Sequence, residues 1–294
     1  MKILNFGSLN IDHVYAMDRF VMAGETKDAA GYAIHAGGKG MNQAVALAKS
    51  GAPVWMAGCI GAEGRFLQKI LEQNGVHTEY IRELEVPTGH AMIQVNEQGQ
   101  NCIILYGGAN RCVTEEMIDR TLEGFEAGDI LLLQNEINGL EMLMRKAFAK
   151  GMRIALNPSP ISEELKKLPV EIITWFVLNE VEGEELSGES APDEMLRVLR
   201  EKYPACRVVL TLGKRGVKYA DAEQVCEHGI YPVKAVDTTG AGDTFLGYFL
   251  GGVAKGMAVP EILEWASKAA ALAVTKPGAA EAIPTAAEVD AAKF

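Results

Sequence analysis

The segment "AVDTTGAGDTFLGYFL" at residues 235–250 joins a glycine-rich turn to an apolar run of helical character. The start of a helix carries free N–H groups and a partial positive charge, so it attracts anions. Asp243 nevertheless places a carboxylate in the predicted first turn. The glycines do not follow the GxGxxG spacing of a dinucleotide site, and the lysine of a GxxxxGK[ST] phosphate loop is absent.

Phosphoryl transfer explains a carboxylate beside such a turn. The amides of Ala241, Gly242 and Asp243 would stabilise charge on the migrating phosphate, and Asp243 would take the proton from an attacking hydroxyl. The alternative is an aspartate that merely complements the helix dipole. The segment alone does not separate these two interpretations.

The rest of the chain alternates buried strands with helices. Apolar runs predict strands at 2–7, 54–59, 129–134, 153–157, 172–179 and 207–213, and helical periodicity lies between them at 40–50, 63–74, 114–122, 138–149, 180–187 and 192–202. This alternation predicts an α/β fold with a doubly wound, mainly parallel central sheet and helices on both faces. We expect one domain over residues 1–294.

Two segments, about 11–36 and 87–107, interrupt the alternation. The second contains alternating apolar residues on either side of the polar turn "EQGQ", which indicates a hairpin. The two segments would pair into a small β-sheet that stands off the main domain, a candidate lid. The alternative is an ordinary surface hairpin.

Composition excludes several classes of protein. The net charge of −11 over 294 residues argues against nucleic-acid binding. The chain contains no apolar stretch long enough for a membrane span and no signal peptide, so we expect a cytoplasmic protein without a membrane partner. Five cysteines without a CxxC pair indicate reduced thiols, and five histidines without ligand spacing predict no zinc site.

Polar residues near the N-terminus have the chemistry of a polyol site. "NFGSLNIDHV" at 5–14 contains Asn10 and Asp12, and "AGGKGMNQAVALA" at 36–48 places a diglycine, Lys39 and Asn42 at a helix start. Such side chains supply both donors and acceptors for hydroxyl groups. Taken singly, each is also typical of a turn or a helix cap.

Together these motifs resemble the ribokinase family of carbohydrate kinases, the phosphofructokinase-B superfamily. The resemblance extends over nearly the whole chain. Both family signatures are present, as "GGKGMNQAVALAKSGAPV" (37–54) and the highly specific "DTTGAGDTFLGYF" (237–249). Further matching segments are "PTGHAMIQVNEQGQNCIILYGGAN" (87–110), "LLLQNEI" (131–137), "LNEVEGEEL" (178–186), "TLGKRGV" (211–217) and "AVTKPGAAEAIP" (273–284).

The resemblance implies a role for individual residues. Asp243 would be the catalytic base, with an anion hole formed by Gly240, Ala241 and Gly242. The sugar would contact Asn10, Asp12, Gly38, Lys39, Asn42, Glu136 and Asp243. ATP would contact Asn179, Thr211, Gly213, Lys214, Arg215, Gly216 and Gly242.

The resemblance also implies two metal ions. Glu182 would position Mg²⁺ through water. A K⁺ ion would bind the Asp237 carboxylate and the carbonyls of Thr239, Ala273, Lys276 and Gly278. The chain departs from the family pattern at Ala282, which replaces a serine hydroxyl ligand, and at Leu178, where many relatives have proline.

The implied reaction is ATP-dependent phosphorylation of the 5-hydroxyl of D-ribose to ribose 5-phosphate and ADP, by a homodimer that pairs through its lids. A same-family kinase for another pentose, a ketohexose or a nucleoside is the first alternative. A sensor that binds a sugar or a nucleotide without turnover is the second, although Asp243 and its glycines argue against it.

Overall fold

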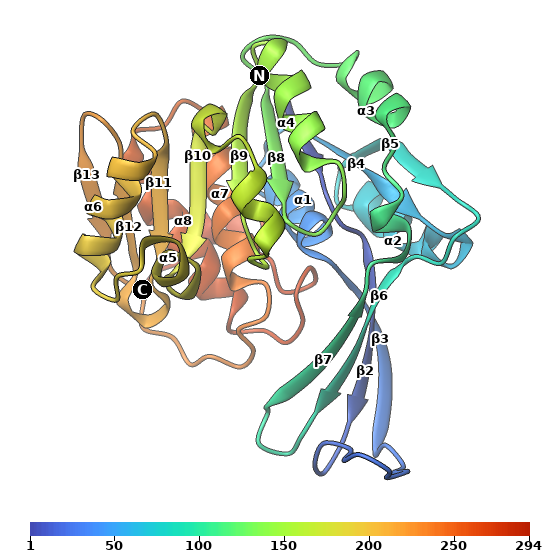
Figure 1. Cartoon of the computed structure of the whole chain (residues 1–294). Coiled ribbons are helices and arrows are strands. Elements are labelled where there is room, and N and C mark those ends of the chain that lie inside the picture. The colour runs from blue at the N-terminus through green and yellow to red at the C-terminus, as the bar shows by residue number, and fades with distance from the viewer.

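Two β-sheets organise the chain, which a computed structural model describes over residues 1–294, with the side chains of Glu164 and Lys166 left out. The large sheet runs in the order β13-β12-β11-β10-β9-β8-β1-β4-β5 (Figure 1). Its strands are β1 (Ile3–Phe6), β4 (Val54–Ile60), β5 (His77–Glu83), β8 (Ile130–Gln134), β9 (Arg153–Asn157), β10 (Trp175–Asn179), β11 (Arg207–Thr211), β12 (Val217–Ala220) and β13 (Val225–His228). All neighbours from β11 to β5 pair in parallel, whereas β12 and β13 add an antiparallel edge.

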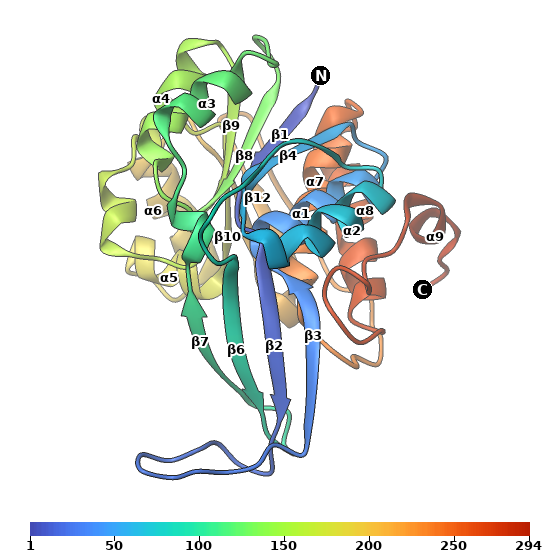
Figure 2. The same cartoon turned by 90° about the vertical axis from the view of Figure 1, so that its right-hand side faces the viewer.

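Helices cover both faces of this sheet (Figure 2). One face packs against α1 (Lys39–Lys49), α2 (Arg65–Gln73), α7 (Ala241–Ala254), α8 (Val259–Ala273) and α9 (Ala286–Ala291). The other packs against α3 (Glu115–Leu122), α4 (Leu140–Ala149), α5 (Glu180–Ser187) and α6 (Pro192–Lys202). The strands are apolar on both faces because each face meets a helical layer. Ile3 and Leu132 point into the first core, and Leu4 and Leu133 into the second. The predicted fold class is confirmed.

Some predicted boundaries were wrong. The predicted strand 172–179 begins only at Trp175, after a short 3₁₀ turn, and the predicted strand 207–213 ends at Thr211. Gly213 has φ +54°, a left-handed conformation that ends the extended chain. Strands β5, β12 and β13 were not predicted, because their sequences lack a continuous apolar run.

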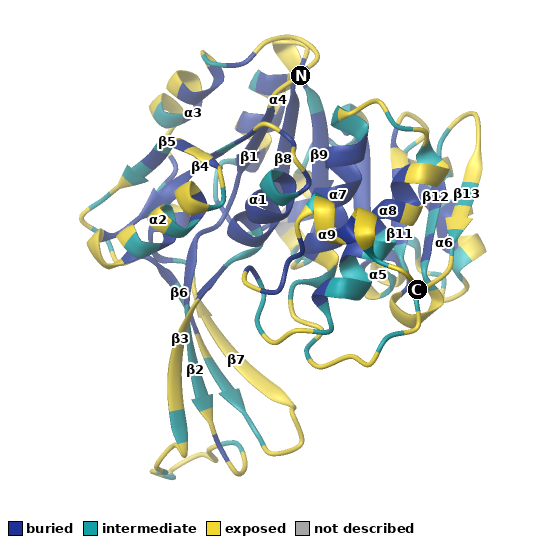
Figure 3. Ribbon diagram, turned by 180° about the vertical axis from the view of Figure 1, so that it is seen from behind, coloured by how far each residue is buried: buried dark blue, intermediate teal, exposed yellow. Residues whose placement is uncertain are grey.

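The second sheet stands away from the α/β body and runs in the order β3-β2-β6-β7 (Figures 2 and 3). Its strands are β2 (Asn10–Ala16), β3 (Gly31–Gly37), β6 (Gly89–Val95) and β7 (Asn101–Tyr106), within one residue of the two segments expected to form a small sheet. Every residue of the edge strand β7 is exposed, including Ile103, Ile104 and Leu105. No helix in the described part of the chain combines the length and the apolar character needed to cross a bilayer.

Candidate active site

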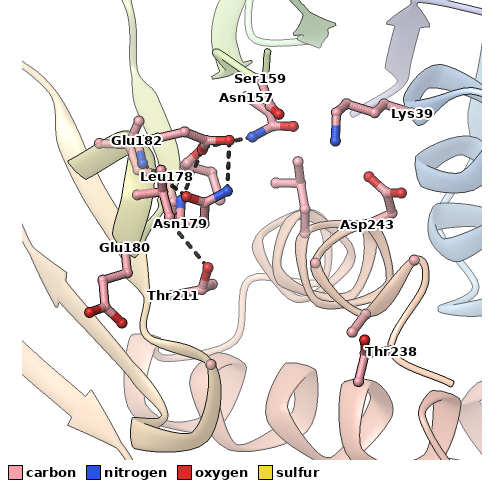
Figure 4. A pocket seen from close by; sticks show the side chains of 17 residues that line it. Lys39, Asn157, Ser159, Leu178, Asn179, Glu180, Glu182, Thr211, Thr238 and Asp243 are labelled. Carbon is pink, nitrogen blue, oxygen red and sulfur yellow. Dashed lines mark hydrogen bonds between the residues drawn. The ribbon is translucent and has the colours of Figure 1, made fainter. Parts of the chain in front are cut away.

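The polar residues expected to form a site gather at the carboxyl ends of the parallel strands. Strand β1 lies between β4 and β8, so the order of strands reverses there, and open α/β sheets bind ligands at such a point. A pocket of about 440 Å³ opens beside it (Figure 4). It is lined by residues that follow β9, β10 and β11 and by the first turns of α1, α5 and α7.

The start of helix α7 forms one wall of this pocket. Gly240 caps the helix with φ +72°, a left-handed conformation that glycine adopts without strain. The N–H of Ala241 reaches the Thr238 carbonyl at 3.3 Å, whereas those of Gly242 and Asp243 have no acceptor among the described residues. A Cβ built on Gly242 would meet no atom within 4 Å, because this glycine faces the open pocket. These amides can therefore receive an anion.

Asp243 lies in the first turn of α7 and is held by two amides from helix α1. The Asn42 side chain donates from Nδ2 to Oδ2 at 3.1 Å, and the Gln43 side chain donates from Nε2 to Oδ1 at 2.8 Å. Lys39 projects toward the same space as Asp243 (Figure 4). The candidate base and the candidate cation thus come from helices that are 200 residues apart in sequence and face one cavity.

The glycine loop before α1 packs tightly on the loop after β1. A Cβ on Gly40 would lie 2.5 Å from the Ser8 nitrogen, and Gly38 has φ +93°. This close approach lets the Lys39 N–H donate to Oε2 of Glu136 at 3.1 Å, and the Ser8 hydroxyl donates to the same oxygen. Glu136 therefore stands directly beside Lys39.

Asn10 and Asp12 extend the same polar surface into the second sheet. The Asn110 side chain donates from Nδ2 to Oδ1 of Asn10 at 2.7 Å, and its own oxygen accepts from the Leu9 N–H at 3.0 Å. A Cβ on Gly37 would lie 2.1 Å from Oδ2 of Asp12, so the glycine leaves room for that carboxylate. The structure thus brings all the predicted sugar-binding residues together.

Burial governs the charge of these groups. Burial, and after it the nearby charge of Glu136, raises the pKa of Asp12 to about 6, although His35 opposes the shift. Burial also raises the pKa of Glu136, against the opposing effects of Ser8 and Lys39. Burial alone would lower the pKa of Lys39, but Asp243, Glu136 and Glu182 outweigh that effect and hold it above the ordinary value.

One buried acceptor identifies a place for a ligand hydroxyl. Oδ1 of Asn42 has no hydrogen-bond partner among the described residues, and the residue is only 7% exposed. A buried oxygen without a donor is unfavourable by about 1–3 kcal/mol. A bound hydroxyl group beside Asn42 would relieve that penalty.

The other half of the pocket lies over β10 and β11. Asn179 caps α5, and Glu182 accepts from the Asn179 backbone at 2.9 Å and from its side chain at 2.8 Å. Thr211 and Gly213 line the same wall. Of the residues expected to contact ATP, Asn179, Thr211, Gly213 and Gly242 line the pocket, whereas Lys214, Arg215 and Gly216 lie outside its lining.

Two of the outlying residues have structural partners. Arg215 pairs with Glu180 at 2.5 Å, which ties the turn after β11 to the start of α5. Gly216 has φ +89°, and a Cβ there would lie 2.1 Å from the His228 carbonyl oxygen, so it permits the close approach of β13.

The donor set suits a magnesium ion that a nucleotide brings with it. Glu182 is 5% exposed and lines the pocket. No group of three or more His, Cys, Asp or Glu residues that could hold a metal exists in the described part of the chain. One carboxylate fits Mg²⁺, because this ion keeps several waters and binds substrate phosphates.

The residues expected to bind K⁺ lie on the loop that precedes α7, and on the last residue of α8 and the loop that follows it. The Asp237 carboxylate accepts from the Thr239 backbone at 2.9 Å and hydroxyl at 2.7 Å, and from the Gly278 N–H at 3.0 Å. Burial raises the pKa of Asp237, but these three donors outweigh it, so the net shift is downward. The Ala273 carbonyl accepts from the Lys276 N–H at 3.2 Å in the same loop.

Three further residues of the site were not predicted: Gln43, Asn110 and Gln134. Gln43 lies inside the quoted signature at 37–54, next to Asn42. Gln134 ends a strand that is otherwise apolar, and this change of character was a usable signal. Asn110 carries no such signal, because polar residues are common in loops.

Comparisons with known proteins agree on one family. The family model described as pfkB family carbohydrate kinase matches residues 1–286. The chain is 36% identical over 291 residues to ribokinase of Haemophilus influenzae, which covers 95% of this chain and 94% of that protein. It is 35% identical to ribokinase of Bacillus subtilis, with 98% of each chain covered. The structure of Arabidopsis thaliana ribokinase complexed with ribose and ATP matches with a TM-score of 0.86 at 30% identity, over 98% of this chain and 96% of that one.

The raised pKa of Asp12 predicts a pH-dependent gain in stability on Asp12→Asn. The folded-state value of about 6 exceeds the unfolded value of 3.8, so the native state loses stability as pH rises between them. At pH 7.5 the free energy of unfolding of Asp12→Asn should exceed wild type by about 1–3 kcal/mol, and this gain should vanish toward pH 4. Urea unfolding at both pH values measures it, with the exposed Asp28→Asn as control. Equal stability of Asp12→Asn and wild type at pH 7.5 would contradict the prediction.

Proposed function

Because the chain belongs to the pfkB family of carbohydrate kinases, we propose that it transfers the γ-phosphoryl group of ATP to the 5-hydroxyl of D-ribose. Family membership makes it an ATP-dependent carbohydrate kinase, and ribose is the proposed acceptor. Support for ribose comes from the near full-length similarity to the two ribokinases and from the likeness to a ribokinase complexed with ribose and ATP.

The observation that carries the proposal is the position of Asp243 beside free helix N–H groups. A carboxylate at a helix start serves little purpose in binding an anion, but it can remove a proton from a hydroxyl that attacks one. The sugar oxygen would attack the γ-phosphorus while its proton passes to Asp243, and the bond from phosphorus to the bridging oxygen of ADP would break. The free N–H of Gly242 would stabilise the charge that develops on the phosphoryl oxygens, together with the N–H of Gly240 and with that of Ala241 once it leaves the Thr238 carbonyl.

The sugar would lie between α1, β8 and the base of the second sheet. Asp12 and Glu136 would accept from its hydroxyls, while Asn10 and Asn42 would donate and accept. The unpaired Oδ1 of Asn42 supports a hydroxyl at that position. Lys39 is the cation that stands nearest to Asp243 and Glu136, and it would donate to both substrates' oxygens.

The nucleotide would occupy the pocket wall formed by Asn179, Thr211, Gly213 and the start of α7, with its phosphates toward Gly242. Lys214, Arg215 and Gly216 would approach it from the turn after β11. Glu182 would hold Mg²⁺ through water, and the ion would neutralise phosphate charge. Asp237 and the 273–278 loop would hold K⁺ against the base of the anion hole, where Ala282 leaves one position for water.

The second sheet would act as a lid on a single kinase domain, and two lids would pair in a homodimer of the cytoplasm. Exclusion of water by such a lid discourages hydrolysis of ATP. Apolar residues at an exposed edge strand are unfavourable in water unless another chain covers them. Ile103 is 53% exposed. It pairs with Ile93 on β6, which in turn pairs with Val14 on β2. These three side chains therefore share the face of the sheet that carries Asp12.

Removal of the base should abolish most turnover while ATP binding persists. Asp243→Asn keeps the shape of the side chain but cannot accept the proton, so kcat should fall by a factor on the order of 10² to 10⁴. Steady-state kinetics and ATP titration by calorimetry measure the two effects. Asp119→Asn on the surface of α3 is the matched control. Turnover close to wild type in Asp243→Asn would remove this residue from the chemistry.

An acceptor screen tests the substrate. With Mg-ATP in a coupled assay of ADP release, we expect ribose to give a higher kcat/KM than deoxyribose, ketohexoses or nucleosides. Turnover should rise when K⁺ replaces Na⁺, and identical rates with both ions would contradict the cation site. Preference for another acceptor would transfer the proposal to that sugar or nucleoside. Ligand binding without turnover on any acceptor would identify a sensor.

A substitution on the lid tests the dimer. Wild type should sediment at about twice the chain mass of 31.7 kDa. Ile103→Asp should shift the protein toward monomer, since a carboxylate in an apolar interface is strongly unfavourable. Ile104→Asp, on the opposite face of the same strand and 62% exposed, should leave the dimer intact. A monomeric wild type, or dissociation by Ile104→Asp alone, would contradict this arrangement.

A further inference from the structure

We propose that Gln43 is a positioning residue that holds Asp243 as an oriented carboxylate, and that the side-chain amides of Gln134 and Asn5 fix the direction of Gln43. The inference rests on the proposed role of Asp243 as general base. Gln43 does not act on the substrate in this proposal. It acts through the carboxylate to which it donates.

A continuous run of hydrogen bonds connects a backbone carbonyl to the base. Nδ2 of Asn5 donates to the Gly40 carbonyl at 2.6 Å. Nε2 of Gln134 donates to Oδ1 of Asn5 at 3.0 Å and to Oε1 of Gln43 at 2.6 Å. Nε2 of Gln43 then donates to Oδ1 of Asp243 at 2.8 Å. Three side-chain amides thus form a relay between Gly40 and Asp243, which we call the amide relay.

The direction of the amide relay is determined at its first member. A backbone carbonyl only accepts, so Asn5 must turn its NH₂ group toward Gly40 and its oxygen toward Gln134. Gln134 must then present its NH₂ group to the oxygens of Asn5 and Gln43. The opposite orientation would set Oε1 of Gln134 against two acceptor oxygens. Each amide therefore fixes the next, and the relay ends with an N–H directed at Asp243.

Water cannot substitute for these bonds. Asn5 and Gln134 are fully buried, and Gln43 is 1% exposed. Buried polar networks are strongly ordered when their bonds are made, because an unmade bond in a medium of low dielectric is unfavourable. Oε1 of Gln134 has no hydrogen-bond partner among the described residues. This side chain therefore joins the relay through its NH₂ group alone.

The fold reserves space for the amide relay. Asn5 lies near the carboxyl end of β1, and Gln134 is the last residue of the neighbouring strand β8. Asn5 is two residues after Ile3, and Gln134 is two residues after Leu132. Because side chains alternate along a strand, both amides lie on the same face as these core residues, toward helix α1. A Cβ on Gly7 would lie 2.0 Å from Oε1 of Gln134, so glycine is needed where the strand passes this amide.

The two amides on Asp243 therefore have different tasks. Asn42 has an unpaired acceptor oxygen, so no second bond fixes its amide and its bond to Oδ2 can be exchanged. Gln43 has its acceptor occupied by Gln134 and its donor on Oδ1, so it stays in place. A donor on a carboxylate favours the charged form and restricts its rotation. Oδ2 is left as the oxygen that takes the proton.

Gln43→Met tests the proposal, since methionine has a similar volume and no donor. We expect kcat to fall by roughly 10- to 100-fold, the loss expected for one hydrogen bond to a charged group. The sugar KM should stay near wild type. Gln134→Met, which frees Gln43 to turn, should produce the same changes at smaller size.

Controls separate this role from a purely structural one. Ser50→Ala removes a buried hydrogen bond at the other end of α1, from the hydroxyl to the Leu47 carbonyl at 2.7 Å, and should leave kcat and KM unchanged. Wild-type kcat in Gln43→Met would overturn the proposal, as would a raised KM at unchanged kcat. If Gln43→Met does not fold, the same readouts on Gln134→Met decide. Wild-type turnover in Asp243→Asn would instead overturn the proposed base itself.

Discussion

The close packing of helix α1 on helix α7 is the contact on which the site depends. A Cβ on Gly247 would lie 2.3 Å from the Ala46 Cβ and 2.8 Å from the Leu47 nitrogen, so the two helices touch backbone to backbone. A larger residue at 247 would force the helices apart, because protein interiors have little free volume. This contact carries the start of α1, with Asn42, to within hydrogen-bond distance of Asp243. Asp243 acquires its amide donors only through that approach.

The second feature of the site is an excess of acidic groups around one cation. Asp12, Glu136 and Asp243 share the surface with Lys39, and burial raises the pKa of Asp12 and Glu136. Such a site disfavours a bare polyanion and favours neutral hydroxyl groups, which can donate to carboxylates. The anion-binding amides lie to one side, at the start of α7, where the helix supplies positive partial charge without a side chain. The proposed sugar and the nucleotide phosphate would thus have separate chemical environments that meet at Asp243.

Much of the fold could be predicted, because long apolar strands and helical periodicities are local signals. The large sheet and its parallel core follow from runs such as "ILLLQ" at 130–134, in which successive residues, and so both faces of the strand, are buried. The antiparallel strands β12 and β13 escaped prediction, since each has only four residues and neither carries a continuous apolar run. Lys214, Arg215 and Gly216 were grouped with the nucleotide site by motif alone. In the folded chain the Arg215 side chain pairs with Glu180, and Gly216 makes room for β13.

The sequence by itself determined the class of fold, the glycine turn with its aspartate, and the identity of the polar residues that would meet a substrate. These are properties of short segments, which carry their own conformational preference and chemistry. Only the tertiary structure decided which buried amides lie behind Asp243, because Asn5, Gln43 and Gln134 are distant in sequence and meet at the end of two strands and one helix. The direction of each amide depends on its neighbour, and only the folded chain brings those neighbours into contact.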